Sequence, residues 1–318
     1  MTNLQPAFDV LTVGEPMALF MATEPAPLHE VRQFARVAAG AELNVAIGLS
    51  RLGLRTAYVT RVGADSFGQF LQAEFAKEGI ATDFVSVVPE QRTGFMLKTR
   101  SADGSDPQIE YFRAGSAASH LSVADLPTAF PARHLHLTGI TPALSPFTKP
   151  MVLALIERAR AAGASISFDP NLRPRLWASQ AEMVSTLNQI ASLVDLVLPG
   201  IGEGEILVGS TDAKQIADFY LQAGAKQVVV KLGPQGAYYQ EAAGNSGTVP
   251  GVPVSQVVDT VGAGDGFATG VISALVEGLP LEQAVARGNA IGARVVQFPG
   301  DSDGLPTRTE LGLAALSA

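Results

Sequence analysis

The sequence predicts an α/β protein: a doubly wound, mainly parallel sheet flanked by helices, with a small β-sheet lid. Short apolar runs alternate with longer segments of helical period, which is typical of a parallel sheet with helices on both faces. Two β-rich segments interrupt this alternation. The 318 residues are 47% hydrophobic, enough to bury a core of one large domain or two smaller ones. Because no repeat or low-complexity linker divides the chain, we expect one domain over residues 1–318.

The regular elements follow from local pattern. Each predicted strand is a short apolar run that ends near a glycine or another turn residue. The strands are expected at 8–14, 56–63, 134–139, 165–169, 194–200 and 227–233. Apolar residues at helical spacing between them predict helices at 42–53, 66–79, 146–163 and 178–194. The chain from about Ala263 onward is predicted to be wholly helical.

The two interrupting segments are residues 17–38 and 93–113. Each looks like a β-ribbon around a turn-rich centre and lacks the long helix that a βαβ unit requires. We interpret them as a small sheet that projects from the main one and serves as a lid or an interface. Two ordinary edge hairpins are the alternative.

Composition excludes several classes of partner. The net charge is -8 and the 22 Lys and Arg residues are scattered, so no basic stripe is available for nucleic acid. The chain has no cysteine, which excludes disulfides and thiolate chemistry. No apolar run reaches the roughly 18 residues of a membrane helix, and the first residues do not resemble a signal peptide. We therefore expect a cytoplasmic protein that binds neither nucleic acid nor membrane.

The stretch VVDTVGAGDGFATG, residues 257–270, points to phosphate chemistry. Its glycines precede an apolar helix, and a helix N-terminus presents free amides and a partial positive charge to an anion. Gly262 and Gly264 lack the Cβ atoms that would keep a phosphate away. Asp265 could be a simple helix cap. Inside an anion site its charge needs a chemical task, and acceptance of a hydroxyl proton in phosphoryl transfer is one.

Other motifs fit less well. No lysine follows these glycines as in a Walker loop, and the first strand-to-helix turn reads VGEP rather than a dinucleotide fingerprint. No G-x-S-x-G elbow occurs. His134 and His136 alternate on one strand and could begin a metal site, but buried strand histidines are commoner.

Three stretches together resemble the ribokinase, or PfkB-type, family of carbohydrate kinases: DTVGAGD (259–265), AGAELNVAIGLSRLG (39–53) with RVGADSFG (61–68), and KLGPQGA (231–237). The resemblance implies ATP- and Mg²⁺-dependent phosphorylation of a sugar hydroxyl. It assigns the general base to Asp265 and the anion hole to the backbone of Gly262, Ala263 and Gly264. We expect the helix terminus to keep Asp265 ionised. A monovalent cation and a homo-oligomer formed through the lid are also compatible with this family.

For the nucleotide, the resemblance implies binding by Asn171, Lys231, Gly233, Gly236 and Asn289. The family usually carries Asn-x-x-Glu near the Mg²⁺ ion. Here Gly200 replaces the Asn, while Glu203 remains and would act on the metal through water.

EYFRAGSAASHLS (110–122), SFDPNLRPRLW (167–177) and PGDSDGLPTRTEL (299–311) resemble the branch that phosphorylates the 6-hydroxyl of 2-keto-3-deoxygluconate. Two arginines suit a sugar acid, because a guanidinium group pairs bidentately with a carboxylate. Arg173 could instead contact ATP phosphates, and Tyr111 could be packing. A fructokinase or related hexose kinase, and a non-catalytic binding module of the same fold, stay as alternatives. The resemblance assigns the sugar acid to Gly40, Asn44, Tyr111, Arg113, Arg173 and Asp301.

Overall fold

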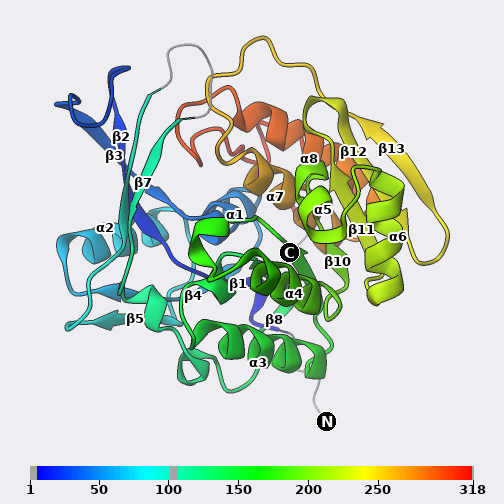
Figure 1. Cartoon of the computed structure of the whole chain (residues 1–318), viewed down its shortest axis with the longest axis horizontal. Helices are drawn as coiled ribbons and strands as arrows, with labels where there is room; N and C mark the ends of the chain where they lie inside the picture. The colour runs from blue at the N-terminus through cyan, green and yellow to red at the C-terminus, as the bar shows by residue number, and fades with distance from the viewer. Residues whose placement is uncertain (1–5, 101–106, 317–318) are drawn as a thin grey trace.

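The computed structural model describes residues 6–100 and 107–316, which form a nine-stranded sheet between two layers of helices and a separate four-stranded sheet (Figure 1). This is the fold class that the sequence predicts. The centre of the second predicted ribbon, residues 101–106, lies outside the described residues.

The main sheet has its N-terminal strand inside it rather than at an edge. Strands β1, β4, β5, β8, β9, β10 and β11 run parallel to one another. The strand order reverses at β1, which pairs with β8 on one side and β4 on the other. In order across the sheet, the strands are β13 (Ser246–Pro250), β12 (Gly236–Glu241), β11 (Gln227–Lys231), β10 (Leu196–Val197), β9 (Ser165–Asp169), β8 (Ala132–Thr138), β1 (Phe8–Val13), β4 (Thr56–Gly63) and β5 (Val85–Val88).

Three features of this sheet differ from the expectation. Strand β5 at one edge was not among the predicted strands. Strand β10 is much shorter than the predicted 194–200, and at its carboxyl end Pro199 has no N–H to continue the ladder. Strands β12 and β13 form an antiparallel hairpin at one edge that the sequence patterns did not reveal.

Helices cover both faces of the sheet. On one face lie α1 (Ala41–Arg51), α2 (Ser66–Lys77), α7 (Ala263–Val276) and α8 (Leu281–Val295). On the other lie α3 (Thr148–Ala161), α4 (Gln180–Ala191), α5 (Ile201–Val208) and α6 (Ala213–Ala223). The four helices predicted between 42 and 194 are all confirmed, with slightly shorter bounds.

Alternating side chains divide the core into two layers. In β11, Val228 and Val230 pack with the cluster on the α3 and α4 face, whereas Val229 packs with the cluster on the α7 and α8 face. This is the pattern of a strand buried on both sides. Burial of each such side chain contributes roughly 1.5–3 kcal/mol.

The small sheet consists of two hairpins that pair with each other. Strands β2 (Met17–Ala22) and β3 (Phe34–Ala39) are antiparallel, as are β6 (Phe95–Lys98) and β7 (Ile109–Phe112). A parallel pairing of β2 with β6 joins the two hairpins into one sheet, which stands beside the main body in Figure 1. The small sheet is therefore a unit distinct from the main sheet, and the edge-hairpin alternative is wrong.

The prediction that the chain is wholly helical from Ala263 is wrong beyond α8. Residues from Pro299 to Leu311 run through turns, as the local density of Gly, Asp and Pro favours. This segment carries Asp301 to the side of the main sheet where α7 begins. Among the helices of residues 6–100 and 107–316, none is long and apolar enough to cross a membrane.

Candidate active site

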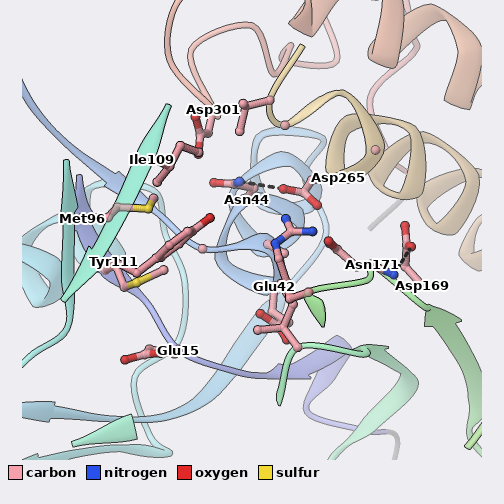
Figure 2. A pocket seen from close by; sticks show the side chains of 18 of the residues that line it. Glu15, Glu42, Asn44, Met96, Ile109, Tyr111, Asp169, Asn171, Asp265 and Asp301 are labelled. Carbon is pink, nitrogen blue, oxygen red and sulfur yellow. Dashed lines mark hydrogen bonds between the residues drawn. The ribbon is translucent and has the colours of Figure 1, made fainter. Parts of the chain in front are cut away.

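A cavity of about 490 Å³ lies where the carboxyl ends of the parallel strands face the small sheet. Ligands of doubly wound proteins bind at this edge, next to the point where the strand order reverses. Figure 2 shows Met96, Ile109 and Tyr111 of the small sheet on one side and Asp265 at the start of α7 on the other. The cavity also brings together most of the predicted sugar and phosphate residues: Gly40, Asn44, Tyr111, Arg113, Asn171, Arg173, Glu203, Lys231, Gly262, Gly264, Asp265 and Asp301.

Helix α7 begins where the glycine-rich stretch predicts. Gly262 is the N-cap with φ of 83°, and a Cβ atom there would lie 2.3 Å from the carbonyl oxygen of Asp301. Only glycine fits this turn. A Cβ on Gly264 would meet only the Lys231 amine, at 3.8 Å, so its backbone borders open space. The Ala263 amide has a long bond of 3.4 Å to the Thr260 carbonyl, while the Gly264 and Asp265 amides have no carbonyl four residues back within the helix.

Asp265 faces Asn44 of α1 across the cavity. The Asn44 Nδ2 group donates to Asp265 Oδ2 over 2.7 Å, as drawn in Figure 2. Burial raises the pKa of Asp265 to about 7, and this Asn44 hydrogen bond opposes the rise. The helix terminus therefore does not keep Asp265 fully ionised at neutral pH, contrary to the sequence-based expectation. A carboxyl group with this pKa can accept and release a proton near neutrality.

The side-chain oxygen of Asn44 is unused. Its side chain is 2% exposed, and within the described part of the chain its Oδ1 atom is buried without a hydrogen-bond partner. A buried acceptor of this kind costs about 1–3 kcal/mol unless a donor satisfies it. Asn44 lines the cavity, but this oxygen is itself buried, so a ligand hydroxyl group would reach it only after the side chain rotates.

The two predicted arginines are placed differently. Arg113 binds Glu15, with 2.6 Å between its Nε and Glu15 Oε2, and Ser116 donates to the other oxygen of the same carboxylate. This pairing was not anticipated, since Arg113 was expected to hold a ligand. Arg173 follows β9 and donates to the carbonyl of Leu172 over 2.9 Å. Among the described residues it has no carboxylate partner within ion-pair distance, so its guanidinium group is the one better placed to receive an anion.

The predicted nucleotide residues lie on the α7 side of the cavity. Lys231 pairs with Asp169 over 2.6 Å. Burial alone would lower the pKa of Lys231, but the carboxylates of Asp169 and Glu203 raise it above its ordinary value. A neighbouring apolar cavity of about 370 Å³ shares Lys231 and Gly264 with the first and is also lined by Gly233, Gly236 and Asn289.

Two of the predicted asparagines have defined backbone roles. Asn289 donates to the carbonyls of Val249 and Pro250, each over 3.1 Å, and so holds the end of β13 against α8. Asn171 has a positive φ of 40°, and its amide donates to Asp169 over 3.1 Å. Asn171 thus shapes the turn after β9 that also presents Arg173.

Glu203 caps the helix that follows β10. Its carboxylate accepts from the amides of Gly200 over 2.7 Å and Leu172 over 3.0 Å, and burial raises its pKa. The replacement of the family asparagine by Gly200 leaves this capping bond intact. No group of three or more His, Asp or Glu side chains suited to a metal ion occurs in residues 6–100 and 107–316.

His134 and His136 already have hydrogen-bond partners inside the main sheet, so they are not candidates for a metal site. Both are buried. His134 is hydrogen-bonded to Ser165 and Ser167 on the neighbouring strand and His136 to Ser167, and burial lowers the pKa of each histidine to about 3. They form a neutral polar ladder inside the sheet, as the commoner interpretation of the sequence anticipated.

The sequence patterns did not identify four residues in or beside the cavity: Glu15, Glu42, Lys98 and Asp169. Glu42 is fully buried and accepts from Thr138 and Thr141, each over 2.6 Å, and its burial raises its pKa. Glu15 and Asp169 stand at the carboxyl ends of β1 and β9. That position was a usable signal, because polar residues just after parallel strands collect at one edge of the sheet.

The fold and this site define a carbohydrate kinase: the chain belongs to the pfkB family of carbohydrate kinases, whose family model matches residues 7–308. A curated relative is the 2-dehydro-3-deoxygluconokinase of Bacillus subtilis (strain 168), which is 50% identical over 95% of this chain and 94% of its own. A PfkB protein from Polaromonas sp. JS666 has a crystal structure that matches with a TM-score of 0.89 and 51% identity, over 97% of this chain and all of the other.

A third similar protein was solved with its nucleotide. It is an E. coli protein described as ribokinase II, in complex with ATP and Mg²⁺, with a TM-score of 0.87 and 27% identity over 96% of this chain and 98% of the other. The family identified from the DTVGAGD stretch is thus confirmed.

Proposed function

We propose that this kinase transfers the γ-phosphoryl group of ATP to the 6-hydroxyl group of 2-keto-3-deoxygluconate. The observation that carries the proposal is the buried Asp265 carboxyl group, which borders the cavity beside the first amides of α7. The 50% identity to a 2-dehydro-3-deoxygluconokinase supports the choice of sugar acid.

The cavity offers contacts for the two kinds of group on a sugar acid, the carboxylate and the hydroxyl groups. Arg173 supplies a guanidinium group for the carboxylate. Asn44 supplies a side-chain amide for a hydroxyl group, and Gly40, Tyr111 and Arg113 line the remaining wall. Asp301 completes the wall beside α7. The substrate then lies with its C6 end toward Asp265 and its acid end toward Arg173.

The transfer step requires little covalent chemistry from the protein. As the sugar O6 atom bonds to the γ-phosphorus, the bond from that phosphorus to the bridging oxygen of ADP breaks, and the hydroxyl proton passes to the Asp265 carboxylate. The transition state is loose, so alignment and charge stabilisation matter most. The amides of Gly262, Ala263 and Gly264 provide that stabilisation at a helix N-terminus.

The nucleotide would lie across the two adjoining cavities. We assign its phosphates to Lys231 and the α7 amides, and its base to the apolar cavity near Gly233, Gly236 and Asn289. Mg²⁺, when bound with ATP, neutralises phosphate charge. The few carboxylates nearby fit an ion held mainly by phosphate oxygens and water, with Glu203 acting through water.

The test is a comparison of substrates. ADP release is measured with 2-keto-3-deoxygluconate, its galacto epimer, gluconate, fructose and ribose under identical conditions. We expect the highest kcat/KM with one of the two keto-deoxy acids, because only these combine the carboxylate with the required chain length and C2 keto group. A higher value with fructose would favour the hexose-kinase alternative. No turnover with any sugar would favour a non-catalytic binding module.

A further inference from the structure

Lys98 is the last residue of β6 in the small sheet, yet its amine is buried between two carboxylates of the main body. Its Nζ atom lies 2.6 Å from Asp259 Oδ2 and 2.7 Å from Asp301 Oδ1. The lysine is 1% exposed, and both aspartates are nearly as buried. Burial alone would lower the pKa of Lys98, but the carboxylates of Asp301 and Asp259 raise it, so the group is an ammonium ion.

Both carboxylates belong to the segments that shape the start of α7. Asp259 accepts a hydrogen bond from the Val261 amide over 3.0 Å through its other oxygen, which fixes the turn leading into Gly262. The Asp301 carbonyl packs so closely on Gly262 that a Cβ atom there would be 2.3 Å away. One ammonium group thus joins three segments that are far apart in sequence: β6, residues 259–262 and the turn at Asp301.

The charges explain why a cation is needed at this point. Asp259 and Asp301 would otherwise face each other in a buried space with no positive charge between them, at a high cost in free energy. The same pair would add negative potential beside the amides that have to receive a phosphoryl group. An ammonium ion in this place removes the repulsion and holds the turn in a single arrangement.

We propose that Lys98 is a positioning residue for phosphoryl transfer: by binding Asp259 and Asp301 it ties the small sheet to the N-terminus of α7 and sets the place of the Gly262–Gly264 amides. The proposal rests on the role assigned above to these amides. Lys98 itself does not line the cavity, so it acts through its two partners rather than on a substrate. Because β6 also contributes Met96 to the cavity wall, the same contact fixes the sugar wall relative to the phosphate site.

Two variants test this role. Lys98→Met keeps the apolar stem and loses the charge, and Lys98→Ala leaves a space the size of a propylammonium ion. Activity is assayed with whichever sugar wild-type enzyme phosphorylates fastest. If the proposed sugar is wrong, the substrate preference of the wild-type enzyme shows it. If the proposed role of Lys98 is wrong, only the kinetics of the variants show it. Circular dichroism and thermal unfolding establish that each variant is folded.

We expect kcat to fall about 10²-fold in both variants, the scale of a small misplacement of reacting groups, with a much smaller change in the KM for the sugar. Propylammonium chloride should restore the kcat of Lys98→Ala at least tenfold. Tetramethylammonium chloride at equal ionic strength carries the same charge but cannot donate a hydrogen bond, and should restore none. Lys98→Met, which has no space for the ion, should respond to neither salt.

Three results would overturn the proposal. One is a kcat within threefold of wild type in folded Lys98→Met. Another is a folded Lys98→Ala variant whose lost activity responds equally to both salts or to neither. The third is failure of both variants to fold, since Lys98 would then serve stability rather than the position of the amides.

Discussion

Replacement of Asp265 by asparagine should lower kcat by roughly 10²–10⁴-fold, the usual contribution of a positioned general base. The change is nearly isosteric and leaves the backbone amides of α7 in place, so the affinity for ATP should change little. It also removes a buried charge, whose desolvation is what raises the pKa of this group, and so should not destabilise the fold. Steady-state kinetics and a nucleotide-binding titration measure the two effects separately.

The matched control is Asp83→Asn. Asp83 is exposed in the connection between α2 and β5, so the same chemical change there should leave kcat unaltered. Near-normal turnover in Asp265→Asn would remove Asp265 from the mechanism. Equal loss of ATP binding and turnover would indicate that the change disturbs the amides rather than proton transfer.

The pH dependence gives a second measure of the same group. Only the ionised form of Asp265 can accept a proton, and burial raises its pKa to about 7. For wild type, kcat/KM should therefore be level above pH 7 and fall toward tenfold per unit below it. Because phosphate groups of ATP also titrate near pH 6, the residual activity of Asp265→Asn serves as the reference. An inflection that persists unchanged in this variant belongs to the nucleotide.

Replacement of Arg173 by alanine should lower kcat/KM for the sugar acid roughly ten- to hundredfold, mainly through KM. This range corresponds to one charge-assisted hydrogen bond of about 1.5–3 kcal/mol. A neutral sugar such as fructose makes no such bond, so its kcat/KM should change less than threefold. The assay is run well above pH 7, because loss of the Arg173 charge also raises the pKa of Asp265.

Arg175→Ala is the control for this experiment. Arg175 lies two residues further along, is exposed, and does not line the cavity, so neither substrate should be affected. Equal losses for acid and neutral sugar in Arg173→Ala would contradict recognition of the carboxylate. Arg113→Ala is a poorer test, because it would leave the buried Glu15 carboxylate without its cation, a change that typically costs about 3–5 kcal/mol.

The parallel sheet and the start of α7 could be predicted because their causes are local. Buried strands such as 227–231 are continuous apolar runs, and the Gly262 turn demands a residue without a side chain. That the two β-rich segments form one small sheet was also predicted, but the strands that join them were not. The pairing of β2 with β6 links residues 77 positions apart by backbone hydrogen bonds, which leave no pattern in either segment. The turns after α8 were missed because the helical period of 281–295 was extended past Pro299.

Side-chain partnerships were the least predictable part of the site. The sequence predicted that Arg113, Asp301 and Asp265 lie in one region. It did not predict which neighbouring side chains pair with them and control their charges. Arg113 turned out to be paired with Glu15, and Asp301 with Lys98. Burial then moved the pKa of Asp265 to about 7, which depends on the closed surroundings of the group rather than on its position in a motif.

In the proposed mechanism, amides at the start of α7 hold the terminal phosphate of ATP while Asp265 faces the sugar alcohol. A crystal structure with a non-hydrolysable ATP analogue and 2-keto-3-deoxygluconate would show both contacts. We predict γ-phosphate oxygens within about 3.2 Å of the Ala263 and Gly264 nitrogens, and the sugar O6 atom within hydrogen-bond distance of the Asp265 carboxylate. Binding of either substrate in another cavity, with Asp265 still bonded to Asn44 alone, would contradict this mechanism.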